Sequence, residues 1–309
     1  MSTEAVHPAE PIVQAIVRGL VLPERTPLQT TPAALGLPFE EVRFETVDGI
    51  SLAGWYIPAA VGNDNGHIVV SNHFGPANRA GYPGHLEGFN SSSNIEVDFM
   101  PLFKAVHEAG YSQLVYDLRN HGESGAARGG VSGSGYFEWP DVLASLAYVR
   151  SRPDTRDKTI QLRSYCMGCN ATFHAMQRDP AAFEGVASLV AIQPLVGRTA
   201  VTKMLALSGV PDAMGRLEAV LMELGDQRVD DHDVRPVAAA VNVPVMFVQV
   251  RNDLVSSADD IQAMHDNVQV ADKTVFWIED TPVRHHGYTH FSTHPSALIE
   301  WLDAHRTAQ

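Results

Sequence analysis

The residues most able to do chemistry are two cysteines near the middle of the chain, Cys166 and Cys169. Ser164 and Gly168 stand two positions before and after Cys166, which gives the small-x-nucleophile-x-small spacing of a sharp strand-to-helix turn. A thiol in such a turn lies beside a helix N-terminus, whose partial positive charge favours the thiolate. The same frame around Cys169 would place the bulky Met167 in a cramped position. We therefore predict that Cys166 is a nucleophile and that Cys169 packs in the first turn of the following helix.

Two other interpretations of this cysteine pair stay open. The Cys-x-x-Cys spacing also occurs in dithiol redox proteins, where the motif lies at a junction between a strand and a helix. The second alternative is that Cys166 is a buried structural thiol without reactivity. A redox pair would need both sulfur atoms, whereas a nucleophilic mechanism would need Cys166 alone.

The composition limits the kinds of protein that this chain can be. It has 309 residues, of which 45% are hydrophobic, and a formal net charge of −14, which argues against a nucleic-acid-binding surface. The first residues, MSTEAVHPAEP, lack the basic and apolar regions of a signal peptide. No apolar run reaches the roughly 20 residues of a membrane span. We expect a cytoplasmic protein, without a disulfide scaffold, that binds neither nucleic acid nor membrane.

The order of the predicted elements indicates an α/β fold. Residues 40–49 and 50–59 alternate as two hairpin strands around Asp48-Gly49, a strong turn signal. Six later segments are short, rich in Val and Ile and not strictly alternating, as strands buried on both faces should be. These six lie at residues 66–73, 112–119, 159–165, 185–194, 243–250 and 273–279. Helical patterns separate most of them, which predicts a mostly parallel sheet covered by helices.

Three segments stand outside this alternation. Residues 1–36 predict an N-terminal helical extension with a Pro-rich connector, and residues 37–309 predict a single domain. Residues 195–240 hold short helical pieces between two strands and are expected to form a small cap. Residues 75–100 form a long, Gly-rich loop. Because ligands bind at the carboxyl ends of the strands in such sheets, we expect both insertions to line the site.

Several motifs together resemble the α/β-hydrolase fold, over about residues 40–305. They are Asn72-His73-Phe74-Gly75, YDLRNHGESG at 116–125, the turn at 164–168, VPVMFVQVRNDLV at 243–255 and HHGYTHF at 285–291. The resemblance implies a mostly parallel eight-stranded sheet flanked by helices, and the chain order nucleophile, acid, histidine. With cysteine as the nucleophile, the chain is similar to dienelactone hydrolases.

The resemblance also implies a Cys-His-Asp triad. Its base would be a histidine after the last strand, and His286 best matches the family's His-Gly-aromatic pattern, with His285 as the alternative base. Its acid would be Asp253, at the position where the fold places a carboxylate to hold the imidazole tautomer. Asp253 could instead be a solvated turn residue that caps the next helix. Less favoured candidates are one further histidine and two further carboxylates: His290, Asp280 and Asp259.

Three histidines spaced by four residues raise the alternative of a zinc site: His286, His290 and His294. This spacing brings the three side chains to one face only if the segment is helical. Gly287, Thr289, Thr293 and Pro295 favour a loop instead. We therefore predict no metal and no cofactor.

The fold would also supply two backbone N–H groups for a developing oxyanion. One is expected from Met167, directly after the nucleophile, and the other from Phe74 after the third strand. His73 is expected to brace this loop at the edge of the pocket. The other pocket candidates are aromatic: Tyr82, Phe89 and Tyr165. Four conspicuous polar residues are expected to build a turn and not to catalyse: Asp117, Arg119, His121 and Ser124.

Taken together, these residues predict a cofactor-independent enzyme that attacks an ester, lactone or thioester and forms a covalent thioester on Cys166. Water would complete a hydrolysis, and another acceptor would complete an acyl transfer. The aromatic and aliphatic residues of the two insertions predict a small-molecule, hydrophobic acyl substrate, and a homodimer stays open. The rivals are a non-hydrolytic cyclase or lyase of the same fold and a Cys-x-x-Cys redox protein.

Overall fold

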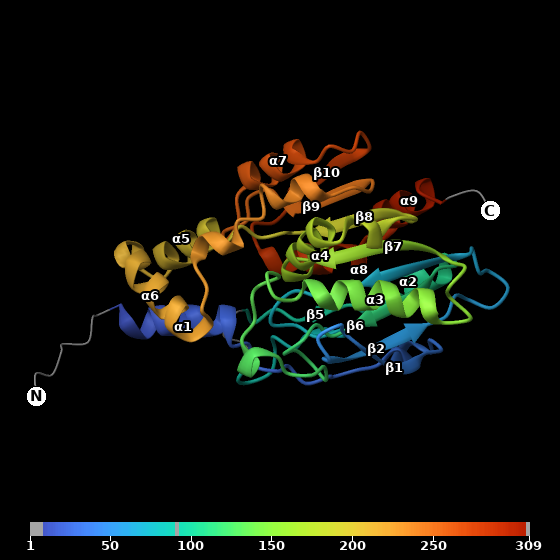
Figure 1. Cartoon of the computed structure of the whole chain (residues 1–309), viewed down its shortest axis with the longest axis horizontal. Coiled ribbons are helices and arrows are strands. Elements are labelled where there is room, and N and C mark those ends of the chain that lie inside the picture. The colour runs from blue at the N-terminus through green and yellow to red at the C-terminus, as the bar shows by residue number, and fades with distance from the viewer. Residues whose placement is uncertain (1–8, 90–92, 307–309) are drawn as a thin grey trace, which may run out of the picture.

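The computed structural model describes residues 9–89 and 93–306, and its centre is an eight-stranded sheet (Figure 1). The strand order is β1-β2-β6-β3-β7-β8-β9-β10. β1 (Glu40–Glu45) and β2 (Ser51–Ile57) form the predicted antiparallel hairpin. The other strands are β3 (His67–Ser71), β6 (Ser112–Tyr116), β7 (Thr159–Tyr165), β8 (Val186–Ile192), β9 (Val245–Val250) and β10 (Lys273–Ile278). β2 pairs antiparallel with β6 and the remaining pairs are parallel, so the predicted sheet is confirmed.

Helices cover both faces of this sheet, and each face has its own apolar core. One face packs against α3 (Trp139–Ser151), α4 (Met167–Arg178) and α7 (Ala258–Asn267). The other packs against α2 (Met100–Glu108), α8 (Arg284–Thr293) and α9 (Ser296–Ala304). β3, β6 and β9 are buried along their whole length, which explains why their sequences do not alternate. The loop between β3 and α2 adds a short hairpin, β4 (Gly81–Tyr82) and β5 (Val97–Asp98).

The segment after β10 differs from the prediction. We expected a loop, and this was wrong, because residues 284–293 form the helix α8. Its buried face is made by Arg284, Gly287, Tyr288 and Phe291, spaced by three or four residues. A Cβ on Gly287 would lie only 2.5 Å from the side chain of Gln193. The glycine is therefore required by close packing inside a helix and not by a turn.

The insertion at 195–240 forms a helical cap together with the N-terminal helix. It contains α5 (Gly197–Leu207) and α6 (Met214–Gly225), and α1 (Glu10–Val21) lies beside α6 although the two are far apart in sequence (Figure 1). The apolar residues of α1 recur every fourth position, which gives it one buried face. That core is formed by Val13, Val17, Val21, Val201, Leu205, Leu217, Val220 and Leu221, among others. The helix α1, which belongs to the segment expected as an N-terminal helical extension, thus packs with the cap insertion.

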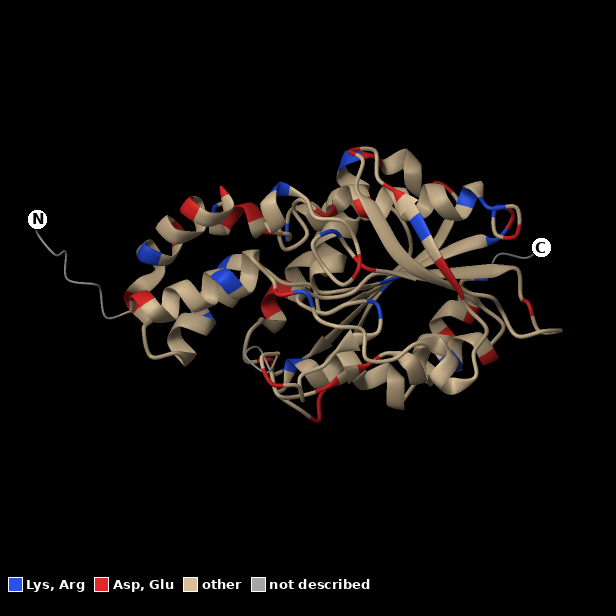
Figure 2. Ribbon diagram, turned by 90° about the horizontal axis from the view of Figure 1, so that it is seen from below, with Lys and Arg blue, Asp and Glu red and all other residues tan. Residues whose placement is uncertain are grey.

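Charged residues of both signs are interspersed along the ribbon (Figure 2). Many are paired on the surface, as Arg198 is with Glu218 and Asp230. In the described part of the chain, no helix combines the length and the apolar character that crossing a membrane requires.

Candidate active site

Cys166 lies at the sharp turn between β7 and α4. Its backbone has φ 45° and ψ −105°, a conformation that residues other than glycine rarely adopt. The turn is held by the backbone N–H of Cys166, which donates to the carbonyl of Ile192 at 2.8 Å. A Cβ on Gly168 would collide with the Asn72 side chain and lie 3.0 Å from the His73 carbonyl. The small residue predicted at this position is therefore needed for the turn to pack against the loop after β3.

The loop after β3 is braced by His73, as expected. The Nε2 atom of His73 accepts the backbone N–H of Leu118 at 3.0 Å, so Nδ1 carries the proton and donates to the carbonyl of Phe74 at 2.9 Å. Burial and the neighbouring His121 lower the pKa of His73 to about 3, which keeps the ring neutral. Within residues 9–89 and 93–306, the N–H groups of Phe74 and Met167 make no hydrogen bond to the protein. Both N–H groups are therefore without a protein acceptor in this part of the chain, and their role as oxyanion donors stays a prediction.

Asp253 is buried and is held by several donors. Its carboxylate accepts from Nη1 of Arg284 at 2.5 Å, from Oγ of Ser256 at 2.6 Å and from the backbone N–H of Val255 at 2.8 Å. Burial alone would raise the pKa of Asp253, but Arg284 and these hydrogen bonds hold it below its usual value. Asp253 is therefore an ionised, buried residue and not a solvated turn residue.

The partner of Asp253 is an arginine, where the triad would have a histidine. Arg284 is also buried, and its Nε donates to the hydroxyl of Tyr288 at 2.7 Å. Its Nη2 donates to the carbonyl of Gln193. Both Arg284 and Tyr288 lie on the buried face of α8. The guanidinium thus joins the buried carboxylate of Asp253 to the backbone just after β8.

Neither of the two predicted bases takes this place. His286, the preferred one, is exposed at the start of α8, and its Nδ1 lies 2.9 Å from Oγ1 of Thr281. His285 is partly buried and contacts the rings of Phe74 and Tyr288. Burial and the nearby Arg284 lower the pKa of His285 to about 4. In the described part of the chain, no hydrogen bond joins either histidine to Cys166 or Asp253, because residues 284 and 288, one turn apart on α8, occupy its inner face.

The less favoured candidates also lie away from the sulfur. Asp280 and Asp259 are exposed. The rings of His290 and His294 stack on each other at 5.1 Å. Although the segment is helical, no group of three or more potential ligand side chains in the described residues is arranged to hold a metal ion.

Cys169 is buried in the first turn of α4. Its thiol donates to the carbonyl of Ser164 at 3.0 Å. Burial, together with the nearby Cys166, raises the pKa of Cys169 well above its usual value. This sulfur is a protonated structural thiol, which is the opposite of what a reactive dithiol needs.

The polar residues of the 116–125 segment build a turn, as expected. The carboxylate of Asp117 accepts the backbone N–H groups of Arg79 and Glu123 at 2.6 and 2.9 Å, and Ser124 Oγ donates to the Asp117 carbonyl at 2.6 Å. His121 donates through Nδ1 to the carbonyl of residue 119 at 2.8 Å, so Nε2 is left as an acceptor.

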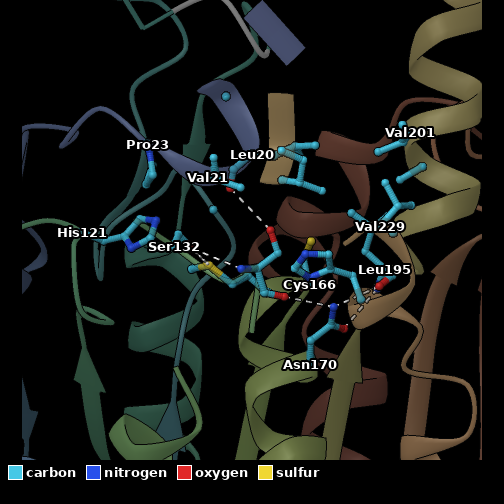
Figure 3. Close-up of a pocket in the computed structure, with 18 residues that line it drawn as sticks. Leu20, Val21, Pro23, His121, Ser132, Cys166, Asn170, Leu195, Val201 and Val229 are labelled. Carbon is cyan, nitrogen blue, oxygen red and sulfur yellow. Dashed lines mark hydrogen bonds between the residues drawn. The ribbon is translucent and has the colours of Figure 1, made fainter. Parts of the chain in front are cut away.

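Cys166 opens into a mostly apolar cavity under the cap (Figure 3). Leu20 and Val21 of α1, with Val201 and Val229 of the cap insertion, lie on the side of Cys166 away from α4. Asn170 of α4 also lines the cavity, and its side-chain amide donates to the carbonyl of residue 195 at 2.9 Å, which connects α4 to the loop after β8. Two imidazoles also line the cavity, His121 and His232.

The residues expected to line this pocket do not line this cavity. Tyr82 and Phe89 border a separate groove against α1. Tyr165 is buried on the other side of the turn, where its ring packs against Phe99 at 4.8 Å. His73 is buried in the loop after β3. The cap closes over Cys166 from the α1 side, and from the loop after β3 Gly75 also lines the cavity.

No protein-family model matches this chain. Esterase Pf2001 of Pyrococcus furiosus superposes with a TM-score of 0.68, over 93% of this chain and 99% of its own, at 18% identity. The α/β hydrolase GrgF of Penicillium sp. sh18 superposes with a TM-score of 0.58, over 86% and 97%, also at 18% identity. These superpositions, with the strand order above, decide the fold.

The chain has the α/β-hydrolase fold.

In sequence, the polyketide transferase grgF of Penicillium sp. is 30% identical over 165 residues, which are 53% of this chain and 47% of that protein. The uncharacterized protein YfhR of Salmonella typhimurium is 26% identical over 137 residues, 44% of this chain and 40% of its own. The chain therefore spans less than half the length of either curated relative.

Within this α/β-hydrolase fold, sequence reasoning missed Arg284, Tyr288 and the α1 wall of the cavity. Helical phase could have indicated the first two, because residues 284, 288 and 291 share one face if the segment is a helix. The adjacent histidines drew attention away from that phase. Leu20 and Val21 carry no local signal, because their position beside residue 166 depends on how the cap folds back.

Proposed function

We propose that this protein is an acyl-transferring or ester-hydrolysing enzyme in which Cys166 is the nucleophile. The observation that carries the proposal is the strained backbone of Cys166 at the N-terminus of α4, with its side chain at a cavity. Strain of this kind persists where the surrounding structure over-determines it, and it is concentrated at functional sites.

In the first step, the Cys166 thiolate attacks the carbonyl carbon of an ester or thioester. A carbon–sulfur bond forms, and the carbonyl electron pair moves to the oxygen, where the N–H groups of Met167 and Phe74 can donate to it. Collapse of this intermediate breaks the bond to the leaving alkoxide or thiolate, which takes a proton from solvent, and leaves a thioester on Cys166. Transfer of the acyl group to water or to another acceptor then restores the thiolate.

The acyl group proposed for this site is hydrophobic. Leu20, Val21, Leu195, Val201 and Val229 present aliphatic side chains to the space above the sulfur. Burying an alkyl chain against such residues contributes about 0.8 kcal/mol per CH₂ group. The Penicillium relative is named a polyketide transferase, which agrees with an extended acyl group but covers only part of the chain.

Intact-mass spectrometry after incubation with a panel of acyl thioesters and phenyl esters tests the proposal. We expect an acyl adduct that maps to Cys166, is absent in Cys166→Ala and is retained in Cys169→Ala. A Cys169→Ala variant without adduct or turnover would favour the redox alternative. Turnover that survives in Cys166→Ala would favour a cyclase or lyase that uses the cavity without a covalent step.

A further inference from the structure

We propose that the groove between α1 and residues 76–89 is the second half of the substrate site. It binds the part of the substrate that is not transferred, an extended polar thiol or alcohol, and it joins the cavity beside Cys166 past Gly19. The inference rests on the proposed function and deepens it by naming the class of leaving group and the path that it takes.

The groove and the cavity beside Cys166 adjoin each other. They have two wall residues in common, Gly19 and Pro23. In the loop after β3, Gly75 lines the cavity and Pro76, the next residue, lines the groove. The two spaces therefore meet between the end of α1 and the loop after β3.

The cavity beside Cys166 is too small to enclose a whole substrate with a long leaving group. Its volume is about 80 Å³, and that of the groove is about 270 Å³. Measured in the same way, one water molecule needs roughly 10–15 Å³, so the cavity has room for only about five to eight waters. An acyl chain can fill this space, but the alcohol or thiol part must then lie outside it, and the adjoining groove offers the larger volume.

Gly19 has no structural reason to be glycine in the described part of the chain. It lies inside α1, where glycine is less favourable than alanine. Its φ is outside the left-handed region, and a Cβ at this position would meet no atom within 4 Å apart from its own neighbours on the helix. Gly287 of α8 is different, since its Cβ would lie 2.5 Å from the Gln193 side chain. Because Gly19 lines both cavities, a larger side chain here would obstruct the passage between them.

The two spaces differ in the chemistry of their walls. Aliphatic side chains line the cavity beside Cys166, including those of Leu20 and Val21. The groove instead carries a charge of each sign, because Arg18 and Glu24 line it and are exposed. An apolar acyl chain is therefore favoured on the Cys166 side, where its burial removes apolar surface from water. A polar thiol or alcohol chain keeps its hydration in the groove, which avoids the cost of burying polar groups.

The groove also gives the leaving group of the first step a path. The thiolate or alkoxide that separates from the acyl carbon stays on the groove side of Gly19 and takes its proton from solvent there. Binding energy from this non-reacting chain can be used to lower the barrier at the carbonyl carbon. A longer polar chain on the leaving group should therefore raise kcat/KM.

The first test measures access to Cys166 and does not depend on turnover. The native protein and its variants are treated with N-phenylmaleimide, and labelling of Cys166 is followed by peptide mass spectrometry. Gly19→Leu should slow this labelling about tenfold or more, because the new side chain stands in the passage. Gly215→Leu is the matched control, since Gly215 also lies in open space on a cap helix, and it should leave the rate unchanged. Equal rates in Gly19→Leu and the native protein overturn the proposed passage.

The second test compares two thioesters of the same butanoyl group, one of N-acetylcysteamine and one of the longer pantetheine. In the native protein we expect kcat/KM to be about tenfold or more higher for the pantetheine thioester. Ala15→Trp narrows the groove at a residue that does not line the cavity, and it should remove this preference. Leu207→Trp, on the exposed face of α5, should keep it. If Gly19→Leu does not fold, Ala15→Trp decides the point, because Ala15 is exposed.

The outcomes separate this inference from the proposed function. Equal values of kcat/KM for the two thioesters, or a preference that survives Ala15→Trp, overturn the inference. If the acyl adduct on Cys166 still forms in those outcomes, the proposed function stands. If neither thioester gives an adduct while the maleimide labels Cys166, the proposed function fails, and this inference fails with it.

Discussion

Asparagine in place of Asp253 should destabilise the fold as well as change the site. The side chains of Asp253 and Arg284 are 1% and 8% exposed, and they meet at 2.5 Å. Asparagine keeps one oxygen acceptor, for either Ser256 or the Val255 amide, which bond to different oxygens of Asp253, and it leaves the guanidinium buried without a counter-charge. Breaking a buried ion pair by removing one partner costs about 3–5 kcal/mol. For a domain of this size, about 2–4 °C per kcal/mol then predicts a fall in Tm of roughly 6–20 °C.

Glu279→Gln is the matched control. Glu279 pairs with Arg251 at 2.7 Å, but its side chain is 59% exposed, so solvent screens the pair and the loss should stay below about 1 kcal/mol. Urea unfolding followed by circular dichroism, with calorimetry for Tm, measures both variants. Equal losses in Asp253→Asn and Glu279→Gln would refute the argument that Asp253 compensates a buried cation.

The pH dependence of Asp253→Asn gives a second check with a definite sign. The pKa of Asp253 is depressed in the folded protein, so its ionisation contributes stability above its unfolded value, about 3.9. That contribution to the free energy of unfolding is lost as the pH falls through the pKa that Asp253 has in the folded protein. The gap in unfolding free energy between the native protein and Asp253→Asn should therefore be full at pH 7 and shrink below about pH 4.

Three further perturbations follow from the same structure. The pKa of His73 is about 3 in the folded protein and near 6.5 in the unfolded chain, so the neutral ring contributes stability above pH 6.5 that is lost as the pH falls toward 3. His73→Gln should therefore make the plot of unfolding free energy against pH shallower, by up to one proton. An unchanged slope contradicts the neutral, braced ring. Ala200→Phe narrows the cavity and should raise KM for long acyl thioesters about tenfold relative to short ones in steady-state assays. Leu207→Phe, on the exposed face of α5, should leave this ratio of KM values unchanged. A shift in KM shared by both variants argues against this cavity as the acyl site. Gly168→Ala should abolish adduct formation at Cys166 and lower the free energy of unfolding by about 1–3 kcal/mol, because the added Cβ collides with the loop after β3. Gly215→Ala, in open space on α6, should be neutral or stabilising by up to about 1 kcal/mol. Thermal melts and adduct formation compare the two variants, and an unchanged stability in Gly168→Ala refutes the close packing.

The sheet was predictable because each of its strands carries a local signal. The segment 159–165 was expected as a strand and is β7 with the same limits, since its residues are almost all buried and bounded by turn residues. The helix starting at Met167 follows in the same way from the order of elements, whereas Asp253 was expected only from the resemblance to the α/β-hydrolase fold. Periodicity and turn chemistry are properties of a few neighbouring residues, so they can be read without knowing the fold.

The partner of Asp253 was not predictable in this way. The sequence offered two adjacent histidines, and Gly287 suggested a loop in which either could face the sulfur. The actual arrangement depends on Gly287 packing against Gln193, about 90 residues away along the chain, which allows a helix at this point. Once the segment is helical, Arg284 and Tyr288 share the inner face and His286 faces solvent. A contact distant in sequence thus overrides the local preference.

The helix at the start of the chain has a consequence for how the protein is produced and assayed. Leu20 and Val21 form part of the wall beside Cys166, and the backbone of Val21 accepts the Ser132 amide at 2.8 Å. A recombinant version that begins at residue 22, or one with a bulky fusion against this helix, would change the shape of the cavity beside Cys166 while leaving the residues of the sheet in place. Such a version could pass every check of folding and still report the wrong preference for acyl chain length.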